Sequence, residues 1–192
     1  MGNTNSVPVD IVSTEELGGL QFVLQFPDNL LSNLWLEPLS PDRVTASLQS
    51  AGANAAALNI SAMPGQSIFG TQHLARLHFT SVPGQSSSFA PLHVDSFAIA
   101  TAAANSSPTE LINDGRAVVV GAHSLLEARL RDGVFRELVL YGKTGVVYTV
   151  EFTTNITNTT WTRLGTVTTT NLSKTVSVGN GQLPTRYYRA KP

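Results

Sequence analysis

Alternating apolar and polar residues run through most of the chain and predict short β-strands. The clearest example is the segment 20–26, Leu-Gln-Phe-Val-Leu-Gln-Phe, whose alternation is typical of a strand with one face in a core. Pro27-Asp28-Asn29 follows it and predicts a stop, because proline donates no ladder hydrogen bond and Asp and Asn favour turns. The same pattern predicts strands at residues 6–12, 44–48, 55–62, 74–80, 92–99 and 117–120, and then at 134–141, 146–153, 161–169, 174–178 and 186–190.

Three segments interrupt this pattern. Residues 31–39 are apolar without a clear period, so we expect an irregular loop with Trp35 in its middle. Residues 124–130 begin with Ser and carry Glu three positions later, which fits a helical capping box, and a strand is the alternative. Asn113-Asp114-Gly115 predicts a tight turn. Regularly spaced short strands with Gly, Pro and Asn between them indicate an all-β protein built from sandwiches.

The distribution of charge indicates two units. Residues 1–122 contain nine acidic and three basic residues, a net charge of −6, whereas residues 123–192 contain four acidic and nine basic residues, a net charge of +5. The change of sign supports a boundary near residue 122, with domains at 1–122 and 123–192. The alternative is a chance distribution of solvated charges.

The residues that several kinds of catalytic or metal site require are absent from the sequence. The chain has no cysteine, which excludes a disulfide, a thiolate zinc site and a thiol nucleophile. It also lacks the HExxH, G-x-S-x-G and Walker patterns, so we predict no enzyme activity and no cofactor. His93 with Asp95 is a weak metal candidate, and Asp28, Asn29 and Asp114 are a weak calcium candidate without EF-hand spacing. Scattered basic residues argue against nucleic-acid binding, and no apolar run reaches the roughly 18 residues of a membrane span.

Residues 6–121 resemble the cohesin family in the order and spacing of four motifs. These are Val7-Pro8-Val9, the strand and turn from Phe22 to Leu31, Gly70 followed by Leu74-Ala75-Arg76-Leu77-His78-Phe79, and Asn113-Asp114-Gly115-Arg116-Ala117-Val118-Val119-Val120. The turn departs from the family, because Pro27 and Asp28 stand in swapped order. Gly19 and Gln21 occupy places where cohesins often carry dockerin-binding polar residues. The resemblance implies a non-catalytic jelly-roll β-sandwich that binds a dockerin-like protein, secreted by bacteria or held at their surface as a scaffold.

Residues 124–191 loosely resemble a small fibronectin type III-like module of secreted bacterial proteins. The motifs are Gly145, Tyr148-Thr149-Val150-Glu151, Thr154-Asn155, Trp161 and Arg186-Tyr187-Tyr188-Arg189. This resemblance implies a spacer or attachment role. The fold expected for the whole chain is therefore a jelly-roll β-sandwich followed by a second, smaller β-sandwich.

The polar sides of three predicted strands give a candidate protein-binding face. Its residues are Gln21, Gln25, Asn59, Ser61, Arg76 and His78. The resemblance to cohesins implies that their three strands lie in the same sheet, the one that binds dockerin. An ordinary solvated sheet face is the alternative. A second function is open as well, a carbohydrate-binding module of a larger secreted glycoside hydrolase, with Trp35 stacking on a polysaccharide.

The first predicted strand is expected to expose an edge. Cohesins carry one more strand before their "valine-proline-valine" strand, and Val7 lies too near the start of this chain for one to precede it. No signal peptide opens the chain, so we expect the natural protein to extend upstream of Met1. The edge at Val7–Val12 is then covered by upstream sequence or pairs with another chain.

Overall fold

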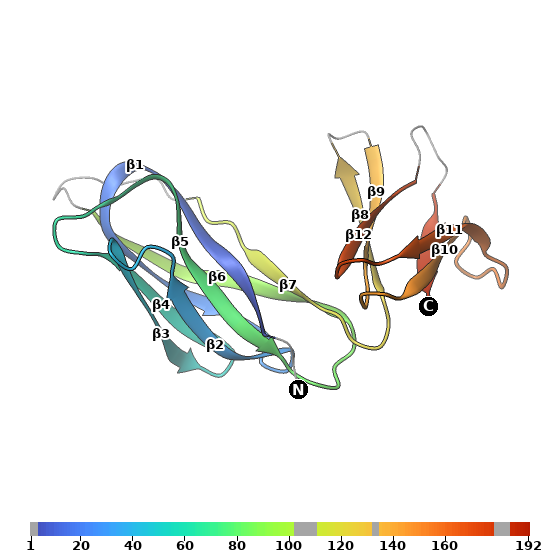
Figure 1. Ribbon diagram of the computed structural model, residues 1–192, viewed down its shortest axis with the longest axis horizontal. Coiled ribbons are helices and arrows are strands. Elements are labelled where there is room, and N and C mark those ends of the chain that lie inside the picture. The colour runs from blue at the N-terminus through green and yellow to red at the C-terminus, as the bar shows by residue number, and fades with distance from the viewer. Residues whose placement is uncertain (1–3, 102–110, 132–134, 179–184) are drawn as a thin grey trace. The chain divides into compact units, whose positions relative to one another are not determined.

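The computed structural model describes residues 4–101, 111–131, 135–178 and 185–192, and every regular element in them is a strand. The all-β prediction is confirmed (Figure 1). The strands are β1 (Thr4–Gln25), β2 (Leu31–Pro38), β3 (Val44–Gly52), β4 (Ala55–Ala62), β5 (Ile68–Ser81), β6 (Ser88–Thr101), β7 (Gly115–Val119), β8 (Leu125–Arg131), β9 (Phe135–Tyr141), β10 (Val147–Thr153), β11 (Thr162–Thr168), β12 (Ser173–Ser177) and β13 (Tyr187–Lys191). In these residues no helix is long and apolar enough to cross a membrane.

The chain divides into two compact units. The first comprises Met1–Pro83 and Phe89–Ala117, and the second comprises Gly84–Ser88 and Val118–Pro192. The predicted module boundary near residue 122 stays a prediction.

Strand β1 belongs to two layers of the first unit. Its first half pairs with β5 from Thr4 to Leu17, and its second half, Gly19–Gln25, pairs with β4 on one side and β6 on the other. The register with β5 shifts between Ser13 and Leu17, where the strand passes from one layer to the next. We name β2, β5 and the first half of β1 the first layer, and β3, β4, the second half of β1, β6 and β7 the second layer.

The core of the first unit lies between these layers. The predicted alternation in 20–26 is confirmed by Leu20, Phe22 and Leu24, which are buried, whereas Gln21 and Gln25 are exposed. Leu58 and Ile60 of β4 and Leu74, Leu77 and Phe79 of β5 are buried as well. Removing this apolar surface from water is the main force that holds the sandwich together.

The irregular loop predicted at residues 31–39 is wrong, because this segment forms β2. Asn33 has a φ of 50°, and the pairing of β2 with β5 shifts between Ser32 and Trp35. This β-bulge adds a residue to one strand and breaks the period-two pattern on which the prediction depended.

The tight turn predicted at Asn113-Asp114-Gly115 is also wrong. Residues 111–114 form no turn, and Gly115 begins β7. The Asp114 carboxylate instead accepts the backbone N–H of Val94 in β6 at 3.0 Å, so this acid ties two distant segments together.

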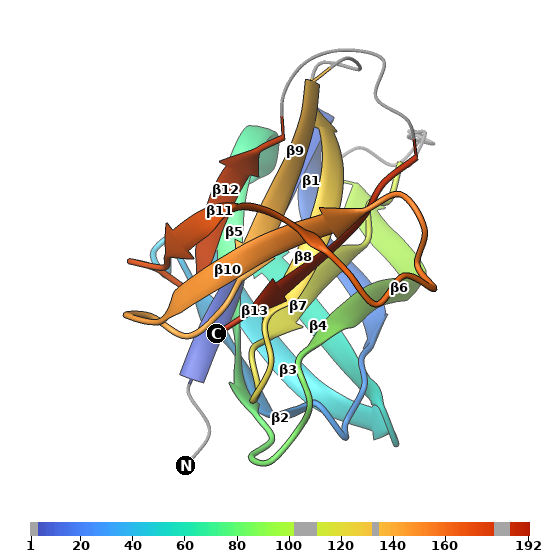
Figure 2. The same ribbon diagram turned by 90° about the vertical axis from the view of Figure 1, so that its right-hand side faces the viewer.

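The second unit is a smaller sandwich of two three-stranded sheets, in the orders β11-β10-β13 and β12-β9-β8 (Figure 2). Residues 125–131 form strand β8, so the helix considered for residues 124–130 is wrong and the alternative, a strand, is confirmed. Leu138, Val150 and Val178 form its core. The Arg189 guanidinium covers the ring of Trp161 at 4.2 Å, which leaves that ring half-buried. The fibronectin type III-like identity stays a prediction.

Candidate functional site

The structure does not bring the six predicted face residues together. Gln21, Gln25, Asn59 and Ser61 lie on the second layer, from β1 and β4. Arg76 and His78 lie on β5, opposite Pro8 and Ser6 of the first layer. The sequence correctly predicted which side of each strand is polar. It did not predict that β1 passes from one layer to the other, because no residue pattern indicates that passage.

Gln21 lies at the centre of a row that crosses four strands. Its direct neighbours are Asn59 on β4 and Ala98 on β6, and Asn59 is followed by Ser47 on β3. All four residues are exposed. Residues opposite one another in a ladder point to the same side, so the row forms part of one surface.

The rows on either side of Gln21 are uncharged too. One row is Thr45, Ser61, Gly19 and Ala100, and the other is Gln49, Ala57, Val23 and Ser96. Together with Ser47, Asn59, Gln21 and Ala98, these residues form what we call the uncharged face. None of the twelve carries an ionisable side chain, although the surrounding unit is strongly acidic.

A shallow hollow of about 220 Å³ lies in the uncharged face, bordered by Gly19, Gln21, Asn59, Ser61 and Ala98 among others. A Cβ atom on Gly19 would approach the carbonyl oxygen of Ile60 to 2.8 Å, so glycine is required for the close approach of β1 and β4. Ser61 and Asn59 both border the hollow, and Ser61 Oγ donates a hydrogen bond to Asn59 Oδ1 at 3.3 Å. Amide side chains both donate and accept, so the hollow offers hydrogen bonds of both kinds around a shallow cavity.

Charged residues border the face on β6, where exposed Asp95 directly precedes Ser96 and His93 lies opposite Gln25. His93 Nδ1 lies 2.8 Å from Asp114 Oδ2. This hydrogen bond raises the pKa of His93. It also lowers the pKa of Asp114, with the Val94 N–H as a second cause. The carboxylate that hydrogen-bonds to His93 is therefore Asp114, and not the Asp95 of the predicted metal candidate.

The metal and calcium candidates are not assembled into a site. With the Asn54 amide oriented so that its nitrogen faces Asp28, that nitrogen lies 2.6 and 2.7 Å from the two Asp28 carboxylate oxygens and donates to them, while Asp114 is engaged by His93. Among the residues that the structure describes, no three His, Asp or Glu side chains gather closely enough to hold a metal ion.

Trp35 lies on the outer side of the first layer, on strand β2. Trp35 is 48% exposed, and its indole stacks on the His78 ring, with centroids 3.8 Å apart and planes within 2°. His78 Nε2 in turn lies 2.7 Å from Glu37 Oε2, which holds the imidazole in place. We call Trp35 with His78 the aromatic pair; a fixed ring of this kind can stack on a flat apolar group.

Sequence reasoning missed the contributions of β3 and β6 to the uncharged face. Thr45, Ser47 and Gln49 do alternate with apolar residues, which is a usable signal. Their place beside Gln21 follows only from the strand order, which a single sequence does not carry.

The fold is similar to that of a known recognition module. A solved complex of the cohesin CaCohA2 with the dockerin CaDoc0917, at pH 5.5, matches with a TM-score of 0.53 and 16% identity. The match covers 62% of this chain and 90% of the other. At this identity the likeness establishes a shared cohesin-like β-sandwich fold. No family model matches the chain, and no curated protein matches it.

Proposed function

We propose that this chain is a non-catalytic protein-recognition module and that the uncharged face is its binding surface. The observation that carries the proposal is a sheet face of four strands without a charge, hollowed at Gly19, on a unit with a net charge of −6. The centres of protein–protein interfaces are depleted in charged residues, because each charge must lose its water on binding. An ordinary solvated face has no reason to lack charged residues, least of all on a unit with this many acidic side chains.

The fold supports a dockerin-like protein as the partner. The similar solved structure is a cohesin in complex with a dockerin. Gly19 and Gln21 differ from the polar residues that the cohesin resemblance implies, so the partner would have to fit an uncharged hollow there.

The first test compares two double variants on opposite layers. The full chain is immobilised and exposed to a panel of purified dockerin modules and to the secreted proteins of its source organism. In Gln21→Arg/Asn59→Arg, two arginines replace two exposed amide side chains. Because both positions are exposed, the fold should be kept, but a partner docked there would have to bury both arginine charges. In Arg76→Ala/His78→Ala, two predicted face residues of the first layer are removed.

The proposal predicts that partners of the wild-type chain are lost from the first variant and kept by the second. A buried, uncompensated charge costs several kcal/mol, which is enough to abolish micromolar binding. If both variants retain the same partners, or if the wild-type chain retains none, the uncharged face is not a binding surface.

A carbohydrate-binding module is the second candidate, and the aromatic pair favours it. The exposed indole of Trp35 is held flat by His78, as an aromatic platform for a sugar ring would be. A glycan array with the wild-type chain, Trp35→Ala and Phe69→Ala separates the cases. Phe69 is a matched control, because it is another exposed aromatic residue of the same unit. Loss of glycan binding in Trp35→Ala alone supports this function, and absence of binding by the wild-type chain rejects it.

We place the module outside the bacterial cell, on the cell surface or in the medium. The cohesin resemblance of residues 6–121 supports this location, because cohesins act on secreted proteins. Fractionation of the source organism with an antibody to the module tests it, and recovery from the cytoplasm alone would contradict it.

A further inference from the structure

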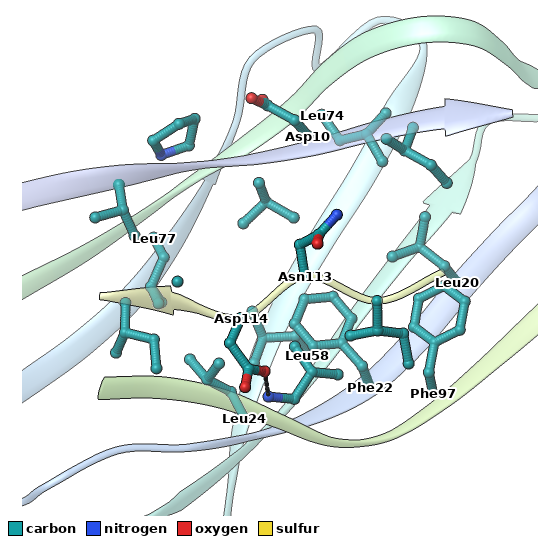
Figure 3. Close-up of a pocket in the computed structure, with 18 of the residues that line it drawn as sticks. Asp10, Leu20, Phe22, Leu24, Leu58, Leu74, Leu77, Phe97, Asn113 and Asp114 are labelled. Atoms are coloured by element: carbon teal, nitrogen blue, oxygen red, sulfur yellow. Dashed lines mark hydrogen bonds between the residues drawn. The ribbon is translucent and has the colours of Figure 1, made fainter. Parts of the chain in front are cut away.

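The cavity in the first unit is lined by core side chains and by two acids, Asp10 and Asp114 (Figure 3). Both acids are engaged within that unit. Asp10 Oδ1 lies 2.7 Å from His73 Nδ1, and Asp114 binds His93 and the Val94 N–H. The sheet β11-β10-β13 of the second unit (Figure 2) offers a different kind of surface, on which three cations surround one carboxylate.

Glu151 is the carboxylate at the centre of this surface. It lies on the middle strand β10, opposite Arg163 on β11 and Arg189 on β13. The residues that precede or follow these three belong to the core or pack against it: Val150, Leu164 and Ala190. Glu151, Arg163 and Arg189 therefore point to the outer side of the sheet. Lys191 follows Arg189 by two positions and points the same way, so the four side chains carry a net charge of +2.

Arg189 is held in a fixed position by Glu151 and Trp161. Its Nε donates to Glu151 Oε2 at 2.7 Å, and its guanidinium lies over the Trp161 ring at 4.2 Å. Lys191 Nζ lies 2.9 Å from the same Glu151 oxygen. Hydrogen bonds from Lys191 and Arg189 lower the pKa of Glu151, so this carboxylate stays ionised. One carboxylate thus orients Arg189 but neutralises only one of the surrounding cations.

The remaining donors of the two arginines face solvent. Among the described residues, none accepts a hydrogen bond from the terminal nitrogens of Arg189, and none pairs with Arg163, which is exposed. The free edge of a guanidinium matches the two oxygens of a carboxylate. Because adjacent strands lie about 4.8 Å apart, Arg163 and Arg189 on the two sides of β10 are separated by about 10 Å. An extended chain of acidic sugars can place two carboxylates this far apart.

The residues beside the arginines suit a sugar chain. Tyr187 precedes Arg189 by two positions, so it points to the same side, and it is 39% exposed. In the next row of the ladder, Thr149 lies opposite Thr166 on one side and Lys191 on the other. An exposed aromatic ring can cover the apolar side of a sugar, and threonine hydroxyls can exchange hydrogen bonds with sugar hydroxyls.

We propose that the outer side of β11-β10-β13 binds a polysaccharide whose sugars carry carboxylate groups. Arg163 and Arg189 each hold one carboxylate, and Tyr187 lies against a sugar ring. We call Arg163, Arg189, Lys191 and Tyr187 the arginine face. This site lies on the second unit, so it does not depend on recognition through the uncharged face of the first unit.

A sugar chain fits the arginine face better than a nucleic acid does. Nucleic acids carry closely spaced phosphates, and proteins that bind them use many cations along the backbone. The arginine face offers a net charge of only +2 around Glu151, and the first 122 residues carry a net charge of −6 that would repel a dense polyanion. One carboxylate per sugar demands far fewer cations.

The test measures binding of short oligogalacturonate and oligomannuronate chains to the full chain by calorimetry. Carboxyl-reduced oligogalacturonate keeps the sugar backbone without the charge and is the ligand control. Single-stranded DNA is titrated in parallel, and light scattering at low salt reports whether the chain self-associates through its oppositely charged units.

Three variants separate the arginine face from net charge. Arg163→Gln removes an exposed cation, and Arg189→Lys keeps the charge but loses the planar fork. Lys174→Gln is the matched control, because Lys174 is an exposed cation of the same unit on β12, in the other sheet. Melting temperatures show whether each variant stays folded.

We expect the wild-type chain and Lys174→Gln to bind the acidic oligosaccharides equally, and Arg163→Gln and Arg189→Lys to bind them about tenfold more weakly. The carboxyl-reduced chain should not bind. The proposal is overturned if neither acidic oligosaccharide binds, if folded Arg163→Gln and Arg189→Lys bind as the wild-type chain does, or if Lys174→Gln weakens binding as much. Equal or tighter binding of DNA would assign the face to nucleic acid, and a dimer that Arg163→Gln abolishes would assign it to a second copy.

Discussion

At the scale of single residues, carboxylates hold the histidines of the first unit. The pairs are His73 with Asp10 at 2.7 Å, His78 with Glu37 at 2.7 Å and His93 with Asp114 at 2.8 Å. Each pair joins two segments that are distant in sequence. Within the part of the chain that the structure describes, none of these pairs has a third His, Asp or Glu close enough to hold a metal ion with it.

The His93–Asp114 pair predicts a pH window of added stability. The pKa of His93 is raised, so its contribution is complete below about pH 6.5 and is lost as the pH rises through the raised folded value. The pKa of Asp114 is lowered, so its contribution is complete above about pH 3.8 and is lost as the pH falls through the lowered folded value. The pair therefore stabilises most between about pH 4 and 6.5.

Urea unfolding of the wild-type chain and Asp114→Asn across pH 2 to 9 checks this window. The stability difference should be largest near pH 5 and should shrink towards both extremes. Asp42→Asn, at an exposed acid on the β2–β3 turn, is the control and should show no such maximum. A difference independent of pH would contradict the pairing.

At the scale of elements, β1 connects the two layers of the first unit. Its second half lies at the centre of the uncharged face, and its first half pairs with β5 in the first layer. Local alternation was enough to predict the buried and exposed sides of residues 20–26. It could not predict the bulge at Asn33, the hydrogen bond from Val94 to Asp114, or the separation of Arg76 from Gln21, because these depend on pairing between distant strands.

Gly19 tests the close packing of β1 against β4. We expect Gly19→Ala to lower the free energy of unfolding by about 1–3 kcal/mol, because its Cβ would be 2.8 Å from the Ile60 carbonyl oxygen and the backbone would have to shift. Gly18→Ala is the neighbouring control, since its Cβ would meet Ala100 O at 3.5 Å. Chemical denaturation measures both. Equal costs for the two variants would show that Gly19 is not under this constraint.

At the scale of the whole molecule, two sandwiches with opposite net charge follow one another. Each has its own buried core, so each should unfold as its own cooperative unit. The uncharged face and the aromatic pair both lie on the first unit.

Matched core variants test this independence by calorimetry. Leu58 and Leu140 are both fully buried, one in each unit. Truncation of either to Ala should cost about 2–5 kcal/mol in its own unit. We expect Leu58→Ala to lower one thermal transition and Leu140→Ala the other. A single transition that both variants lower equally would mean that the units unfold together.

NMR on the side-chain amides shows whether a partner binds at the uncharged face. The probe is the dockerin module from the panel that the wild-type chain binds most tightly. We expect the amide signals of Gln21, Gln49 and Asn59 to shift on binding, while that of Gln72 on β5 and the indole signal of Trp35 stay in place. Shifts at Gln72 or Trp35 with the face unchanged, or no binding by any dockerin or captured protein, would contradict this expectation.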